Sequence, residues 1–181
     1  MLHLKNITAG NPKTAEQYQM TKQHGITWLF SEDDKNWYEE QKNFASDTIK
    51  MVYTGDGRVV WVGKDVTGIE PRNASVIEVP DITANRRITA PGYWFYRNDE
   101  FVFDYKLKAE DERDALLKQV SIMTSDWEKD LLLGLISDED REKLKAYRIY
   151  AKSLQAMDFS PITDKTSYNA IEWPVSPEAS S

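Results

Sequence analysis

The hydrophobic pattern of this chain changes near residue 106, and this change limits the folds open to it. Before that point, β-branched and aromatic residues form short runs separated by turn residues. After it, apolar residues recur every three or four positions, which is the spacing of one face of an α-helix. The chain has 181 residues, a length that suits one domain or two small ones. We therefore expect an α+β chain with an antiparallel β-rich domain over residues 1–106 and a helical domain over 107–181.

The β-rich part begins with a helix signal. Asn11 and Pro12 are typical of an N-cap and first helical position, and Gly25 is a typical stop, so we expect a short leading helix over about 12–24. Runs rich in β-branched and aromatic residues predict strands at 26–30, 48–53, 59–62, 75–79, 93–96 and 101–103.

Turn residues join four of these strands into two hairpins. Gly55-Asp56-Gly57 supplies residues that tolerate positive φ, and 97–100 forms the second turn. In the first hairpin, Ile49, Met51 and Tyr53 are expected on one face and Thr48, Lys50 and Val52 on the other. The stretches 64–74 and 81–92 have no periodicity, so we interpret them as loops.

The helical part predicts two helices, the first from Ala109 onward, and a tail. Gly134 ends the first helix, Ser137 begins a capping box with Asp140, and the short gap between them requires an antiparallel hairpin. Beyond Met157 the pattern stops, and the prolines around Trp173 require an extended tail. The predicted inner faces are Leu116, Val120, Met123, Trp127 and Leu131 on the first helix, and Leu144, Tyr147, Ala151 and Leu154 on the second. The pairs Asp114/Lys118 and Glu139/Lys143 have favourable i,i+4 spacing.

Composition excludes several classes of protein. The net charge is −7, from 23 basic and 30 acidic residues, which argues against broad nucleic-acid binding and against adsorption to anionic membranes. There is no cysteine, so disulfides, thiol catalysis and Cys-ligated metals are excluded. The apolar run 131–136 is far shorter than a membrane span, and the first ten residues predict no signal peptide. We expect an acidic protein of intracellular type, without membrane insertion.

The sequence offers little catalytic chemistry. Its two histidines, His3 and His24, have no metal-ligand partner at suitable spacing, and no glycine-rich phosphate loop occurs. Carboxylate pairs such as Asp33/Asp34 fit solvated surface better than a glycosidase site, so a glycan hydrolase is the least favoured alternative. We assign no catalytic residue, no metal site and no cofactor.

The 21 aromatic residues, 6 Trp, 9 Tyr and 6 Phe, can build a core or a recognition surface. Trp37 illustrates the choice, because as a core residue it would support stability and as a surface anchor it would support binding. Arg86 and Arg87 form a basic pair in an irregular segment and suit a carboxylate or phosphate. The candidate partner-binding side chains are Trp28, Trp37, Tyr38, Trp61, Arg86, Arg87, Tyr93 and Trp94.

Several ordered segments resemble the tail fibre assembly protein family of tailed bacteriophages, and within it the phage Mu-like members. They include Leu4-Lys5-Asn6-Ile7, Asn11-Pro12-Lys13-Thr14, Lys35-Asn36-Trp37-Tyr38-Glu39-Glu40, Pro80 to Arg87, and the terminal Trp173-Pro174 pair. The resemblance covers nearly the whole chain. Two features depart from it: a longer segment between Met157 and Trp173, and an unusually aromatic hairpin from Gly92 to Phe103.

The resemblance implies a non-enzymatic role. Members of the family are needed for the tail fibre protein to fold and trimerise, they act on its C-terminal region, and some help bind host lipopolysaccharide at the fibre tip. It implies work in the host bacterial cytoplasm during assembly. A purely structural receptor-binding tip protein remains the alternative, and homo-oligomer formation is left open. We expect the fibre to contact the β-rich part, with Arg86 and Arg87 at the edge of that surface.

Overall fold

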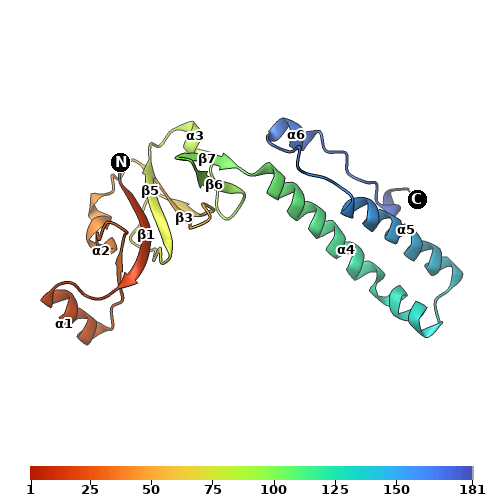
Figure 1. Ribbon diagram of the computed structural model, residues 1–181, viewed down its shortest axis with the longest axis horizontal. Coiled ribbons are helices and arrows are strands. Elements are labelled where there is room, and N and C mark those ends of the chain that lie inside the picture. Colours follow the sequence, from red (N-terminus) through yellow and green to blue (C-terminus); the bar gives the residue numbers. More distant parts are fainter. Residues whose placement is uncertain (181) are drawn as a thin grey trace. The chain divides into compact units, whose positions relative to one another are not determined.

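The computed structural model describes residues 1–180. It contains an antiparallel sheet followed by helices, and so confirms the predicted α+β class (Figure 1). The chain divides into two compact units, Met1–Phe103 and Asp104–Ser181. None of the helices in the described part of the chain combines the length and apolar character needed to cross a membrane.

The first unit is built on a five-stranded antiparallel sheet with the strand order β2-β1-β5-β3-β4. A separate two-stranded hairpin, β6-β7, lies beside it and joins it through a bridge between Arg58 and Phe95. The strands are β1 (His3–Gly10), β2 (Trp28–Phe30), β3 (Ile49–Thr54), β4 (Val59–Gly63), β5 (Ala74–Val79), β6 (Trp94–Arg97) and β7 (Glu100–Phe103). The short helices are α1 (Ala15–His24), α2 (Trp37–Glu40), η1 (Gln41–Asn43) and α3 (Thr83–Arg86).

Strand β1 was not predicted, because its apolar residues do not alternate. Leu4 and Ile7 are three positions apart, yet both are fully buried in the same cluster. A β-bulge between them inserts one extra residue into β1, so both side chains point to the same face of the sheet. Asn6, in the bulge, has φ +49°. A second bulge, opposite Val52 and Tyr53, leaves Val60 exposed on β4.

Apolar side chains cover both faces of the sheet. One face holds the cluster Leu4, Ile7, Leu29, Trp37, Val52, Val66, Ala74 and Val76. The other holds Ile49, Met51, Val59, Val79, Ile88 and Trp94. The prediction that Ile49 and Met51 lie on one face of the sheet and Val52 on the other is therefore correct. Val52 and Lys50 are buried as well. Strands covered on both sides show little polar alternation.

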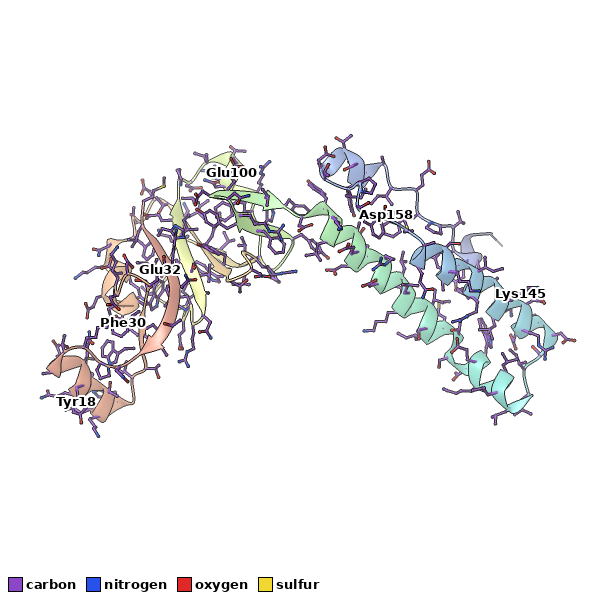
Figure 2. The ribbon with its side chains drawn as sticks, viewed as in Figure 1. Tyr18, Phe30, Glu32, Glu100, Lys145 and Asp158 are labelled. Carbon is purple, nitrogen blue, oxygen red and sulfur yellow. The ribbon has the colours of Figure 1, made fainter. Side chains whose placement is uncertain are left out.

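The leading helix starts later than predicted. Thr14 caps it by accepting a hydrogen bond from the Gln17 amide at 3.1 Å, and Asn11 lies outside. Gly25 ends the helix at φ +67°, as predicted. Tyr18 on this helix is exposed (Figure 2). The segment predicted as the loop 81–92 contains the single turn α3.

The second unit is an antiparallel pair of long helices, α4 (Tyr105–Leu133) and α5 (Asp138–Gln155), followed by α6 (Lys165–Asn169) and η2 (Pro177–Ser180) (Figure 1). Gly134 ends α4 at φ +71°, and Ser137 caps α5, as predicted. The four predicted core residues of α5 are all buried: Leu144, Tyr147, Ala151 and Leu154. Lys145 points away from α4 into solvent (Figure 2).

Four details of the helical prediction were wrong. Helix α4 begins at Tyr105 rather than Ala109 because Asp104 caps it. On its inner face Thr124 is buried, while Met123 and Leu131 are 41% and 47% exposed. Asp114 pairs with its neighbour Arg113 at 2.7 Å instead of with Lys118, whereas Glu139–Lys143 forms at 2.7 Å. The extended tail is interrupted by α6, whose capping box uses Asp164 and Ser167.

Candidate partner-binding surfaces

Trp28 and Tyr38 line a groove of about 520 Å³ beside α1. The Trp28 indole nitrogen donates to the Thr21 hydroxyl at 2.8 Å, so this side chain is held in place and is 6% exposed. Tyr38 packs edge-on against Trp28, with ring centroids 5.9 Å apart, and is 39% exposed. Tyr38 and the partly exposed Met20 can therefore contact a partner in this groove, and Trp28 forms the floor of the groove.

Trp37 is a core residue. Its side chain is fully buried, lies in the cluster with Leu4 and Val76, and packs edge-on against Phe44 at 6.1 Å. Asn36 holds it there by capping α2 through the Tyr38 amide. The hypothesis that Trp37 is a surface anchor is corrected, because a side chain without exposed area offers nothing to a partner.

Trp61 is half-buried against the same core face. Its ring lies over Gly63, where a Cβ atom would come within 2.5 Å of the ring carbons. Gly63 therefore leaves the space in which Trp61 packs. The backbone at Gly63 covers one edge of this ring, so Trp61 contributes more to the packing of the sheet than to an exposed binding surface.

Arg87 and Trp94 come together on the opposite face of the sheet. The guanidinium carbon of Arg87 lies 5.3 Å from the Trp94 ring centre, and Trp94 itself is 8% exposed. Tyr93 packs edge-on against Phe103 at 6.0 Å. Arg87 and Trp94 line a pocket of about 380 Å³ together with Ile88, and Tyr93 lies outside its lining. Trp94 is its apolar floor, and Arg87 is its exposed cation.

Arg86 belongs to an ion cluster centred on Asp81. The Asp81 carboxylate contacts the Arg86 Nε at 2.6 Å and the Lys64 Nζ at 2.6 Å. Hydrogen bonds from Arg86 and then Lys64 lower the pKa of Asp81 to about 2. The two cations and one carboxylate carry a net charge of +1, next to a pocket of about 480 Å³ lined by Ile49 and Gly63. The ion pair with Asp81 fixes the orientation of the Arg86 side chain, whose guanidinium group is still exposed and suits an acidic group on a partner.

Sequence reasoning missed an aromatic cluster at the start of β1. The His3 Nε2 lies 2.7 Å from the Tyr53 hydroxyl, and Tyr53 packs against Tyr96 with centroids 4.8 Å apart. Tyr96 continues to Phe101 at 5.0 Å. Burial, together with the Asp99 carboxylate, raises the pKa of Tyr96 to about 12, and burial lowers the pKa of His3. The aromatic content of the second hairpin was the only sequence signal for this cluster.

The eight predicted side chains thus fall into separate groups. Trp28 and Tyr38 share one groove, Arg87 and Trp94 share another, and Tyr93 packs against Phe103. Trp28, Trp37 and Trp94 are buried, which limits the area they can offer to a partner. The partner-binding role of the eight side chains remains an untested prediction. Within residues 1–180, no group of three or more His, Asp or Glu side chains is arranged to hold a metal ion.

The end of the helical hairpin carries a further exposed surface. Leu132, Leu133 and Leu135 are 87%, 70% and 72% exposed around the helix-ending Gly134. Sequence analysis noted this run only as too short for a membrane span. Exposed apolar side chains that are neighbours in the chain are typical of contact surfaces.

Comparison with known proteins gives consistent results. The family described as "Caudovirales tail fibre assembly protein, lambda gpK" matches residues 39–178. "Tail fiber assembly protein U'" of Escherichia phage Mu is 49% identical over 171 residues, which cover 90% of this chain and 97% of the relative. "Tail fiber assembly protein U" of the same phage is 39% identical over 184 residues, covering 98% and 100%. The "Probable tail fiber assembly protein" of Escherichia phage P2 is 41% identical over 164 residues, covering 87% and 94%. The chain therefore belongs to the tail fibre assembly protein family of tailed phages.

Proposed function

We propose that this chain is a chaperone that binds the C-terminal region of a phage tail fibre protein and promotes its folding and trimerisation. The observation that carries the proposal is the family match, which extends over most of the chain in relatives named for tail fibre assembly. The chemistry is binding rather than turnover, and no catalytic residue is assigned.

The sheet unit offers the surface that suits such a client. Strand β4 ends the sheet order, and Val60 is exposed on it. A fibre region that has not yet closed into its trimer exposes strand edges and apolar side chains, which pair with an open edge of another sheet. Asp81 joins Arg86 to Lys64, the residue that follows β4, so the exposed cation Arg86 lies near this edge and supplies a charged contact.

Co-expression tests the proposal directly. The C-terminal segment of the fibre encoded beside this chain is produced with and without it, and size-exclusion chromatography with light scattering follows the fibre. Soluble fibre trimer only in the presence of the chain supports chaperoning, and co-elution supports stable binding. Trimer formed equally well in its absence contradicts the chaperone function.

A paired set of variants tests the surface. Arg86→Gln with Arg87→Gln removes two exposed positive charges from the sheet unit, and Arg141→Gln with Lys145→Gln removes two from α5. We expect the first pair to reduce fibre co-elution about tenfold and the second to leave it unchanged. Equal effects of both pairs would contradict a surface on the sheet unit.

The alternative role is that of a receptor-binding protein that stays at the fibre tip and contacts host lipopolysaccharide. The exposed guanidinium groups of Arg86 and Arg87 favour it, because bidentate contacts to phosphate are typical of arginine. Chaperoning takes place in the host cytoplasm during assembly, whereas a tip protein persists in mature particles. Detection of the chain in purified virions, and binding of the purified chain to lipopolysaccharide, separate the two roles.

A further inference from the structure

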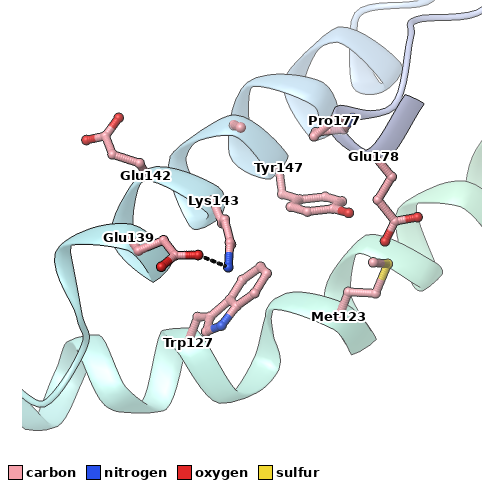
Figure 3. Close-up of a pocket in the computed structure, with 9 residues that line it drawn as sticks. Met123, Trp127, Glu139, Glu142, Lys143, Tyr147, Pro177 and Glu178 are labelled. Atoms are coloured by element: carbon pink, nitrogen blue, oxygen red, sulfur yellow. Dashed lines mark ion pairs between the residues drawn. The ribbon is translucent and has the colours of Figure 1, made fainter. Parts of the chain in front are cut away.

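The helical unit contains a groove of about 770 Å³ that the proposed function does not use. Its residues come from both long helices and from the C-terminal turn η2: Met123, Trp127, Glu139, Glu142, Lys143, Ala146, Tyr147, Pro177 and Glu178. Figure 3 shows the Trp127 and Tyr147 rings on the two sides of this space, with Glu178 at one end and Glu139 at the other.

The walls of the groove are apolar and aromatic. Trp127 on α4 and Tyr147 on α5 have ring centroids 6.0 Å apart, inclined at 42°. Tyr147 is buried, Trp127 is half-buried, and Met123 is 41% exposed. A methionine beside two aromatic rings makes an adaptable apolar wall, of the kind that accepts side chains from a helix or an extended segment.

The charges around the groove are unbalanced. Glu139, Glu142 and Glu178 contribute three negative charges and Lys143 contributes one positive charge, a net of −2. Lys143 is already paired, with Glu139 at 2.7 Å and Asp140 at 3.6 Å.

The other two carboxylates, Glu142 and Glu178, have an exposed or a neutral partner. The nearest cation to Glu142 is Lys145 at 3.7 Å, and both side chains are largely exposed. Glu178 forms a hydrogen bond with Tyr147. Burial is the main cause of the raised pKa of Tyr147, and this hydrogen bond raises it further. A basic partner would therefore find a carboxylate at each end of the groove, Glu142 beside Glu139 and Glu178 on η2 (Figure 3).

We propose that this groove docks a polypeptide segment of a partner, which lays apolar side chains on Met123, Trp127 and Tyr147 and places basic side chains beside Glu142 at one end and Glu178 at the other. A basic side chain beside either carboxylate gains ionic attraction, and one that lies on the Trp127 ring gains cation–π attraction. The apolar walls provide the remaining contact area.

Charge decides against a second copy of this chain as the occupant. The chain has a net charge of −7, and the charged residues that line the groove carry a net charge of −2. Two such surfaces brought together would repel. A basic segment is attracted to the same surface.

The test uses the full-length chain and a fluorescein-labelled amphipathic peptide of leucine and lysine, followed by fluorescence anisotropy. We expect saturable binding of this peptide and none of the matched leucine–glutamate peptide. Glu142→Gln with Glu178→Gln should weaken binding about fivefold or more, because two ionic contacts are lost. Trp127→Leu, which keeps an apolar side chain, should weaken it about fivefold as well.

A matched control separates the groove from the general negative charge of the protein. Asp47→Asn with Asp111→Asn removes the same number of charges at exposed positions outside the groove, and we expect it to change the affinity by less than about twofold. Equal weakening by the control pair, or absence of peptide binding to the wild-type chain, overturns the proposal. Binding of maltohexaose that the Trp127→Leu variant abolishes, without peptide binding, would assign the groove to carbohydrate instead. Circular dichroism of each variant confirms that it is folded.

Discussion

Glu78 on β5 lies directly opposite Lys50 on β3, and the two residues are only 5% and 1% exposed. Glu78 accepts hydrogen bonds from the Leu2 amide at 2.9 Å, the Ala45 amide at 2.6 Å and the Thr48 hydroxyl at 2.7 Å. The Lys50 ammonium donates to the carbonyl oxygens of Ala45 and Thr48. This buried pair therefore ties the start of β1 and the 44–48 segment to the centre of the sheet.

Replacement of Glu78 by glutamine should destabilise the sheet unit by about 3 kcal/mol. Glutamine keeps one acceptor oxygen, but its amide group faces backbone donors and the buried Lys50 loses its nearby negative charge. Urea denaturation at neutral pH measures the loss. Glu16→Gln, at an exposed position of α1, is the control and should have little effect.

The same carboxylate predicts acid sensitivity. Burial alone would raise the pKa of Glu78, but hydrogen bonds from Leu2, Thr48 and Ala45, with Lys50 nearby, outweigh it and hold the pKa below its usual range. The folded pKa is therefore lower than the unfolded one, so the stabilisation is complete above the unfolded pKa and is lost as pH falls through the folded value. Between neutral pH and pH below the usual glutamate range, the wild-type chain should lose more unfolding free energy than Glu78→Gln. Parallel curves for the two proteins would contradict this.

Trp37→Ala should lower the free energy of unfolding by about 3–5 kcal/mol, because it empties a fully enclosed site in the core. Tyr38→Ala, one position along, should cost about 1 kcal/mol or less, since Tyr38 is 39% exposed and loses one edge contact and one hydrogen bond. Thermal denaturation of both variants makes the comparison. Similar losses in both would mean that Tyr38 is not a surface residue.

The Asp81 cluster predicts a measurable titration. Arg86 and Lys64 hold the pKa of Asp81 at about 2, and Arg86→Gln should move it up toward the ordinary value for aspartate. Carboxyl-carbon NMR follows each group separately. Asp65 is an internal reference, because its pKa is lowered by the Thr67 amide and hydroxyl and should not move.

Alanine substitutions at the two glycines of the first hairpin turn should have very different effects on stability. Gly57 has φ +90°, and a Cβ atom there would lie 2.5 Å from the Tyr96 carbonyl oxygen, whereas Gly55 has no atom within 4 Å of that position. Gly57→Ala should therefore cost about 1–3 kcal/mol and loosen the contact between the turn and β6. Gly55→Ala should be nearly neutral. Equal stabilities of the two variants would show that the turn is not constrained by β6.

The sequence by itself determined those features that depend on neighbours in the chain. The change of period near residue 106 separated sheet from helices, Gly134 and Ser137 defined the helical hairpin, and the turn residues defined both β-hairpins. Each of these signals acts through local backbone geometry or capping.

Tertiary structure decided what depends on distant contacts. β1 is a strand although Leu4 and Ile7 break alternation, because a bulge turns both toward one core. Lys50 is buried because Glu78, which is distant along the chain, lies opposite it on β5. Trp37 and Tyr38 are adjacent in sequence, yet one is core and the other surface, since burial is fixed by what packs against each side chain and not by residue type.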